Sequence, residues 1–234
     1  MEPQKLLIKV NERESVTALL YRASKKIAAN VTLVLGHGAG ANQLSPFMRL
    51  FGSGLAARGL DALTFNFLYT EQGRRVPDPK ARLEACYGAV VETALSEKTL
   101  KNNRLIVGGK SMGGRIASQI AAVDCDNIAG LVFLGYPLHP PGKPEQLRDA
   151  HLRDVKRPML FVQGSRDAFG SEEEIRAVIK KRGLKATLYV IPGGDHSLKV
   201  PKSATAGQKA VSQQEVYEAV MDEVARWAKE STSS

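Results

Sequence analysis

The chain has 234 residues, 43% of them hydrophobic, a size and composition typical of one α/β domain that spans residues 1–234. It has no run of eighteen apolar residues and no apolar signal segment before Lys9 and Glu12, which argues against a membrane span and against secretion. The net charge of +9 comes from scattered basic residues without interleaved aromatic side chains, so we expect a solvated surface and no nucleic-acid or membrane partner. The two cysteines, Cys86 and Cys125, form no disulfide framework, and we expect reduced thiols in a cytoplasmic protein.

Predicted strands and helices alternate along the chain, which is typical of a mostly parallel sheet with helices on both faces. The first two strands are the exception, because they are expected to form an antiparallel hairpin. Apolar and β-branched runs predict strands at residues 5–10, 16–21, 31–35, 63–65, 105–108, 131–134, 157–163 and 186–191.

Helix starts are marked by capping residues and proline. Ser45-Pro46 and Asp78-Pro79 each provide an N-cap followed by proline at the first helical position, and Ser171 with Glu174 matches a capping box. One further short helix is expected over residues 145–153. The apolar residues expected on core-facing helix stripes are Phe47, Leu50, Phe51 and Leu55, then Leu83, Cys86, Tyr87, Val90 and Val91, and finally Val216, Val220, Val224 and Trp227.

The strand at 31–35 ends in a glycine-rich turn, Gly36-His-Gly-Ala-Gly40. Such a turn lets backbone N–H groups approach a substrate oxygen closely. A dinucleotide or phosphate loop is the competing interpretation. It fails because the third glycine and the P-loop lysine are missing, and Asn66 stands near the end of the next parallel strand where an acidic residue is needed.

The run at 105–108 leads into Gly109-Lys-Ser111-Met-Gly113, which matches the G-x-S-x-G nucleophile elbow between a strand and a helix. Serine at the apex of so sharp a turn has a strained backbone, and glycine is needed on both sides because side chains there would collide. A glycine- and serine-rich loop is the plain alternative. The apolar strand before the motif and the helical sequence after it favour the elbow.

The partners of such a serine occur downstream in the order acid, then histidine. Asp167 follows the strand at 157–163, and His196 follows the strand at 186–191. Because the carboxyl ends of parallel strands meet at one sheet edge, both side chains are expected near Ser111. Of the four histidines, only His196 lies after Asp167, so the sequence leaves one choice of base.

These residues resemble the α/β-hydrolases over nearly all of the chain. More narrowly, residues 66–75 and 135–148 resemble a branch that includes testis-expressed protein thirty and the hydrolase-like subunit three of the non-specific-lethal histone acetyltransferase complex. Dienelactone hydrolases are related, although their nucleophile is typically cysteine and this chain has Ser111. The resemblance implies the α/β-hydrolase fold, with Ser111, Asp167 and His196 as a catalytic triad.

The resemblance also implies an oxyanion hole made by the backbone N–H groups of Met112 and Ala39, with Gly38 or Gly40 as alternatives to Ala39. No metal and no cofactor are expected, because the histidines are dispersed and no His-x-x-x-His or Cys-x-x-Cys pair occurs. Only residues 135–156 separate the strands at 131–134 and 158–161, so no large lid domain is expected.

The function that follows is a serine hydrolase acting on a small ester or thioester through an acyl-enzyme. The alternative is a hydrolase-fold interaction or scaffolding subunit with a vestigial triad, as the resemblance to a complex subunit allows. The intact triad residues weigh against it. The sequence does not define the oligomeric state.

Three further residues are candidates for substrate binding. Arg74 and Arg75 follow a strand that opens on the expected site, where they would clamp an anionic substrate group. A solvated loop, or an ion pair with Glu71 or Asp78, is an equally good interpretation. His139 would rim the pocket, but a structural hydrogen bond within its proline-rich turn is favoured.

Overall fold

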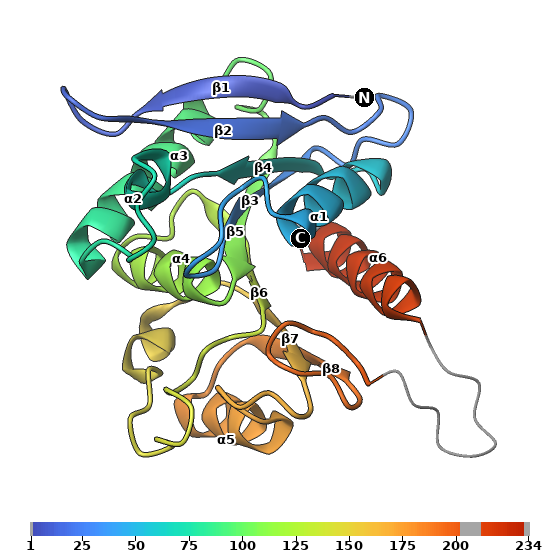
Figure 1. The fold of residues 1–234 in the computed structure, drawn as a ribbon. Coiled ribbons are helices and arrows are strands. Elements are labelled where there is room, and N and C mark those ends of the chain that lie inside the picture. The colour runs from blue at the N-terminus through green and yellow to red at the C-terminus, as the bar shows by residue number, and fades with distance from the viewer. Residues whose placement is uncertain (1, 202–211, 232–234) are drawn as a thin grey trace.

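A computed structural model of the chain describes residues 2–201 and 212–231. Its strands form one sheet in the order β1-β2-β4-β3-β5-β6-β7-β8 (Figure 1). The strands are β1 (Gln4–Lys9), β2 (Ser15–Tyr21), β3 (Val31–Gly36), β4 (Asp61–Phe65), β5 (Arg104–Lys110), β6 (Ile128–Leu134), β7 (Met159–Gly164) and β8 (Ala186–Ile191). β2 is antiparallel to β1 and to β4, and the other neighbours are parallel. This confirms the predicted sheet and its N-terminal hairpin.

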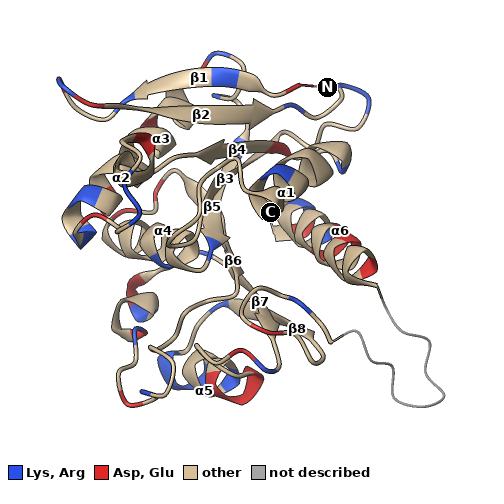
Figure 2. Ribbon diagram, viewed as in Figure 1, with Lys and Arg blue, Asp and Glu red and all other residues tan. Residues whose placement is uncertain are grey.

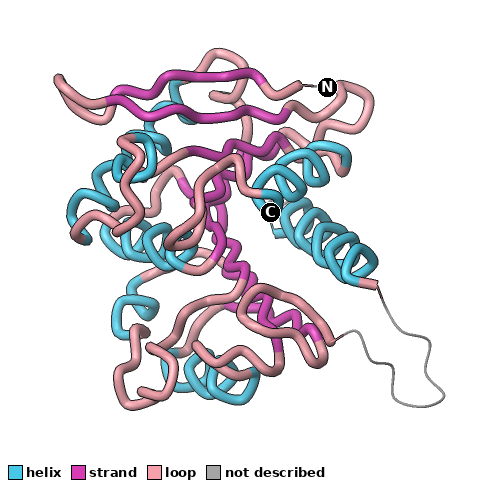
Figure 3. The backbone as a smooth tube through the Cα atoms, in the orientation of Figure 1, coloured by secondary structure: helices cyan, strands magenta, loops and turns pink. Residues whose placement is uncertain are grey.

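Helices cover both faces of the sheet (Figures 1 and 3). They are α1 (Pro46–Ala57), α2 (Leu68–Glu71), α3 (Lys80–Ser96), α4 (Met112–Val123), the 3₁₀ helix η1 (Ala150–Asp154), α5 (Glu172–Arg182) and α6 (Gln213–Ser231). α1 and α6 lie together on one face, whereas α3 and α4 lie together on the other. Two separate apolar cores result, one on each side of the sheet.

The central strands have apolar side chains on both faces because helices cover both faces. All six residues of β3 are buried, as expected for a parallel strand at the centre of a covered sheet. On the α1 and α6 side, Trp227 packs against β6 where Gly130 leaves room: a Cβ at that glycine would lie 2.9 Å from the indole ring. Burying an aromatic side chain of this size stabilises the fold by roughly 2–3 kcal/mol.

Most predicted helix starts agree with the structure. Ser171 and Glu174 form the reciprocal capping box at the start of α5, and α1 begins at Pro46 after Ser45. The start predicted at Asp78-Pro79 is shifted by one residue, since α3 begins at Lys80 with Pro79 as its N-cap. Asp78 does not cap this helix; its buried carboxylate forms an ion pair with the exposed Arg74.

The helix predicted over residues 145–153 is wrong for most of its length, since only Ala150–Asp154 is helical, as a 3₁₀ turn. The backbone of the preceding segment bonds outward to a neighbouring loop. The Arg148 N–H donates to the Leu138 carbonyl (2.7 Å), and the Tyr136 hydroxyl donates to the Arg148 carbonyl (3.0 Å). These tertiary bonds replace the i to i−4 bonds of a helix.

Among the described residues no large lid domain is inserted, and no helix is both long and apolar enough to cross a membrane. Basic and acidic residues are spread over most of the elements in Figure 2 and do not collect on one of them. The loops at the carboxyl ends of β3, β5, β7 and β8 lie at the same edge of the sheet. These loops contain the residues of the candidate site.

Candidate active site

Ser111 lies at a sharp turn between β5 and α4. Its backbone has φ 50° and ψ −114°, so it is one of the few non-glycine residues with a positive φ. This conformation is disfavoured for residues with a Cβ and costs on the order of 1–3 kcal/mol. The turn places the serine directly before the first residue of α4, where free backbone N–H groups begin.

The glycines around Ser111 are required by contact with β3. A Cβ at Gly109 would lie 2.2 Å from the Gly36 carbonyl oxygen, and a Cβ at Gly113 would lie 2.1 Å from the same atom. Both distances are far below van der Waals contact. The obstacle at both positions is therefore the neighbouring strand, which approaches the elbow without any side chain between them.

The strain at Ser111 predicts an unusual order of stability between two variants. We expect Ser111→Gly to be more stable than Ser111→Ala by about 1 kcal/mol, because glycine relieves the positive φ and alanine does not. At unstrained positions alanine is the more stable by roughly 0.4–1 kcal/mol. Urea unfolding of both variants measures the difference, and an alanine variant more stable than the glycine variant would contradict the strain.

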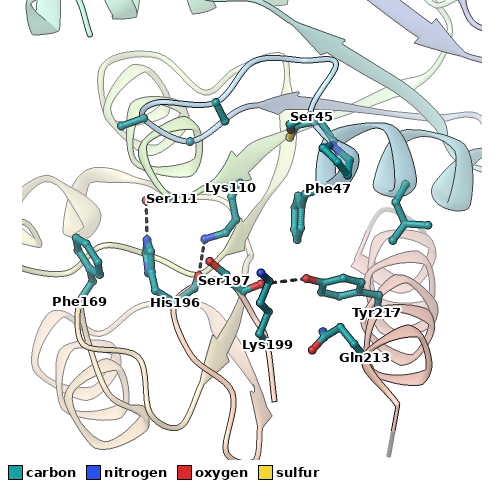
Figure 4. A pocket seen from close by; sticks show the side chains of 16 residues that line it. Ser45, Phe47, Lys110, Ser111, Phe169, His196, Ser197, Lys199, Gln213 and Tyr217 are labelled. Atoms are coloured by element: carbon teal, nitrogen blue, oxygen red, sulfur yellow. Dashed lines mark hydrogen bonds between the residues drawn. The ribbon is translucent and has the colours of Figure 1, made fainter. Parts of the chain in front are cut away.

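A continuous hydrogen-bonded chain links Ser111, His196 and Asp167. His196 Nε2 lies 2.8 Å from Ser111 Oγ (Figure 4). On the other side of the ring, His196 Nδ1 lies 2.8 Å from Asp167 Oδ2 and 3.0 Å from Asp167 Oδ1. The fold brings these predicted residues together from the ends of β5, β7 and β8. The contact with Asp167 makes Nδ1 the protonated nitrogen, so Nε2 is free to accept the serine proton.

Further contacts fix the Asp167 carboxylate and the His196 ring. Asp167 is buried, and its two oxygens accept hydrogen bonds from Gln163 Nε2 and from the Phe169 N–H, each 2.8 Å long. The Phe169 ring stacks on the His196 imidazole with 4.0 Å between ring centroids. Gln163 and Phe169 were not singled out from the sequence, because nothing in their spacing shows that they face the acid and the base.

Asp195 directly precedes His196 in the sequence, but its carboxylate is engaged in other contacts. Its Oδ1 accepts hydrogen bonds from the backbone N–H groups of Ser197 (2.7 Å) and Lys199 (2.9 Å). It therefore closes the turn that carries His196 and leaves the contact with Nδ1 to Asp167.

The glycine-rich turn after β3 lies beside Ser111. A Cβ at Gly38 would be only 3.6 Å from the Ser111 Cβ, and Ala39 lines the same pocket as Ser111. The Met112 N–H belongs to the first turn of α4, where no preceding carbonyl of the helix can accept from it. The predicted donors Ala39 and Met112 thus come from the two segments that border the serine.

His37 holds this turn in place from behind. Its ring is fully buried, with Nδ1 2.9 Å from the Gly38 carbonyl and Nε2 accepting from the Phe67 N–H at 3.3 Å. Both contacts fit the neutral ring protonated at Nδ1. Burial lowers the pKa of His37 to about 4, and the bond to the Gly38 carbonyl only partly opposes this.

His37 predicts a loss of stability in mild acid. Its folded pKa lies below the value of about 6.5 for an unfolded chain, so the unfolded state takes up the proton first as the pH falls. Stability is complete above about pH 6.5 and declines toward pH 4 by an amount on the order of 3 kcal/mol for this one group.

Unfolding free energies of the wild type and of His37→Gln, measured between pH 7 and pH 4, test this prediction. The variant should show the shallower decline, whatever its absolute stability. His151, whose pKa burial also lowers to about 4, stays in both proteins and contributes equally. Equal slopes would contradict the role given to His37.

A pocket of about 690 Å³ opens beside Ser111 (Figure 4). Apolar side chains of α1, together with Tyr217 of α6, form its far wall, and Phe47 meets the Tyr217 ring edge to face at 5.7 Å. The lining residues are Gly38, Ala39, Ala41, Ser45, Pro46, Phe47, Met48, Leu50, Lys110, Ser111, Phe169, His196, Ser197, Lys199, Gln213 and Tyr217. The helix stripes predicted as core faces thus contribute Phe47 and Leu50 to the site as well.

Lys110 is a site residue that the sequence interpretation missed. It stands between Gly109 and Ser111 in the elbow, and its Nζ donates to the His196 carbonyl at 2.5 Å. Burial lowers the pKa of Lys110 to about 8, although the carboxylates of Asp167 and Asp195 favour its charged form. A charged residue at the end of a buried apolar strand was the available signal.

Arg74 and Arg75 do not line this pocket. They line a smaller hollow of about 210 Å³, together with residues 40–42 of the glycine-rich turn and with Tyr69, Thr70 and Gly73. Arg74 Nη2 lies 2.6 Å from the buried Asp78 carboxylate, which matches the ion pair offered as the alternative interpretation. Arg75 is exposed.

His139 also lies outside the pocket. Its Nδ1 is 2.8 Å from the Pro140 carbonyl, and its Nε2 is 3.2 Å from Glu174 Oε1. The His139 N–H donates to the Phe169 carbonyl at 3.0 Å, which ties the proline-rich turn to the residue that stacks on His196. No group of three or more metal-ligating side chains occurs among the described residues.

Comparison with known proteins agrees with this geometry. A family model for an alpha/beta hydrolase domain matches residues 29–229 of the chain. The chain belongs to the alpha/beta hydrolase domain family. The match includes every residue of the hydrogen-bonded chain and of the turn around His37.

Several solved structures are similar to this α/β-hydrolase over almost its whole length. An alpha-beta serine hydrolase homologue from Coxiella burnetii has a TM-score of 0.73 at 17% identity, covering 97% of each chain. A lidless α/β serine hydrolase from Xanthomonas campestris has a TM-score of 0.73 at 16% identity, over 97% of this chain and 95% of that one. A dienelactone hydrolase from Anabaena variabilis has a TM-score of 0.70 at 19% identity, over 97% of each. At these identities the similarity establishes the fold.

Proposed function

We propose that this α/β-hydrolase is a serine hydrolase that cleaves a small ester or thioester, with Ser111, His196 and Asp167 as its catalytic triad. The observation that carries the proposal is the continuous hydrogen-bonded chain from Ser111 Oγ through His196 to Asp167, which opens into the 690 Å³ pocket. An open pocket of this volume suits a small acyl or leaving group, and no inserted domain encloses a long chain among the described residues.

In the first step the Ser111 oxygen attacks the carbonyl carbon while His196 Nε2 takes the serine proton. The carbonyl oxygen becomes an oxyanion, to which we expect the N–H groups of Met112 and Ala39 to donate hydrogen bonds. Removal of one such donor typically costs about 3 kcal/mol in the barrier. His196 then gives its proton to the departing alkoxide or thiolate, and the acyl group remains on Ser111.

In the second step water takes the place of the leaving group. His196 removes a proton from water, the hydroxide attacks the acyl-enzyme, and the proton returns to Ser111 Oγ as the carboxylic acid departs. Asp167 keeps the imidazole proton on Nδ1 and stabilises the imidazolium that forms in each step. Gln163 and the Phe169 N–H hold the Asp167 carboxylate at the required angle.

The proposal includes the narrower branch and the setting of the protein. Residues 66–75 and 135–148 support membership in the branch of testis-expressed protein thirty and the non-specific-lethal complex subunit three. We place the enzyme in the cytoplasm as one domain, with a small-molecule substrate as its partner and no need for nucleic acid or a membrane. Serine at position 111 separates it from dienelactone hydrolases that use cysteine.

The first test is active-site labelling. A fluorophosphonate should add once to the wild-type protein, at Ser111, and intact mass spectrometry should detect the adduct. Ser111→Ala should remove the label and lower turnover of a short-chain p-nitrophenyl ester by roughly three to six orders of magnitude. Full labelling of the variant would refute the assignment of Ser111, and an unlabelled wild type would favour the interaction subunit.

The second test concerns the acid. Asp167→Asn should lower turnover on the order of ten-thousandfold, because asparagine no longer holds the Nδ1 proton or stabilises the imidazolium. Asp195→Asn is the matched control, since among the described residues the Asp195 carboxylate accepts hydrogen bonds only from backbone N–H groups of its own turn. It should keep far more activity than Asp167→Asn. The reverse order would transfer the role of the acid to Asp195.

A further inference from the structure

The pocket beside Ser111 has a positively charged wall. Its described lining residues include two lysines, Lys110 and Lys199, and no aspartate or glutamate. Lys110 reaches the pocket from the end of β5, and Lys199 reaches it from the loop after β8 (Figure 4). The two cations therefore come from different parts of the sequence and face one space.

Lys110 has hydrogen-bonding capacity left over. One of the three N–H groups on its Nζ donates to the His196 carbonyl, which leaves two without an acceptor among the described residues. No described carboxylate forms an ion pair with Nζ. Burial lowers the pKa of the Lys110 amine to about 8, so the amine is still mostly charged at neutral pH. A half-buried cation with free donors can bind an anionic ligand group through charge-assisted hydrogen bonds, which are stronger than bonds between neutral groups.

Lys199 is exposed, and the acid nearest to it in the turn is already engaged. The Asp195 carboxylate accepts from the Lys199 backbone N–H, at 2.9 Å, and from the Ser197 N–H. It therefore closes the turn and forms no ion pair with the Lys199 amine. The ammonium group is left to face the pocket opening.

The rest of the wall is apolar. Phe47 of α1 and Tyr217 of α6 lie across the pocket from the lysines, and Met48 and Leu50 of α1 also line the pocket. The pocket thus joins a hydrophobic surface to a cationic one within reach of the serine. This combination fits a molecule with an apolar body and one anionic group.

We infer that the substrate is an ester or thioester bearing a second, anionic group, such as a carboxylate, which Lys110 and Lys199 bind while its apolar part packs on α1. This inference rests on the proposed function and gives it a substrate class. It assigns to these lysines the role that the sequence had suggested for Arg74 and Arg75, which border a different hollow.

Binding to catalytically inert Ser111→Ala protein tests the inference. The probes are 4-phenylbutyrate and 4-phenylbutyramide, which share shape and differ in charge, and calorimetry gives the dissociation constants at fixed, modest salt. We expect the carboxylate to bind about tenfold more tightly, the scale of one charge-assisted hydrogen bond. A third probe, 3-phenylpropylphosphonate, shows whether a carboxylate or a phosphate-like dianion is preferred.

Lysine variants on the same background locate the anion. Lys199→Met and Lys110→Met should each reduce the preference for the carboxylate at least about threefold and leave amide binding unchanged, since each removes one of two cations. Lys101→Met is the matched control: it removes the same charge from an exposed residue just before the other end of β5, and should change neither constant. If Lys110→Met fails to fold by circular dichroism, Lys199→Met decides alone.

Equal binding of carboxylate and amide would overturn the inference, as would no measurable binding of the carboxylate at its solubility limit. A preference that survives in both lysine variants would also overturn it, because the acid would then lie in the oxyanion site as a product does. The probes contain no ester bond and only their binding is measured, so none of these results depends on whether the wild type cleaves esters. Failure of the proposed function appears instead in the fluorophosphonate experiment.

Discussion

The candidate site depends on one close approach, that of the elbow glycines to the end of β3. Gly109 and Gly113 both meet the carbonyl of Gly36, at distances where a Cβ would overlap it. This contact sets the angle at which α4 leaves β5 and leaves Ser111 with a positive φ. It also fixes the glycine-rich turn that follows Gly36 against the serine. The proposed nucleophile, Ser111, and one of its expected oxyanion donors are therefore positioned by the same backbone contact.

Three successive sets of residues hold Ser111 and its partners in place, and each set lies farther from Ser111 than the one before. His196 contacts Ser111 Oγ, and Asp167 contacts His196. Gln163 and Phe169 hold that pair, and His139 in turn holds Phe169 through its backbone. The buried, neutral His37 gives the glycine-rich turn similar support. Such support matters because a catalytic hydrogen bond is useful only when its geometry is kept during the reaction.

The features best predicted from sequence were those that depend on local sterics or strand order. The elbow is recognisable because glycine alone fits at positions 109 and 113, and the order Ser111, Asp167, His196 follows from parallel strands ending at one edge. Side-chain partners between distant segments could not be predicted. The segment before η1 bonds to Leu138 and Tyr136 instead of forming a helix, and Arg74 pairs with Asp78, because no local periodicity encodes such contacts.

In the proposed mechanism, Lys110 connects substrate binding to the position of His196. Its Nζ donates to the His196 carbonyl and the residue also lines the pocket, so one side chain contacts both the loop of His196 and the pocket beside Ser111. An anion bound at Nζ would share this amine with the His196 carbonyl without displacing it, since an ammonium group has three donors. The energy of holding a remote charged group could then keep the His196 loop in its catalytic position. In that arrangement binding energy from a non-reacting part of the substrate supports the chemical step.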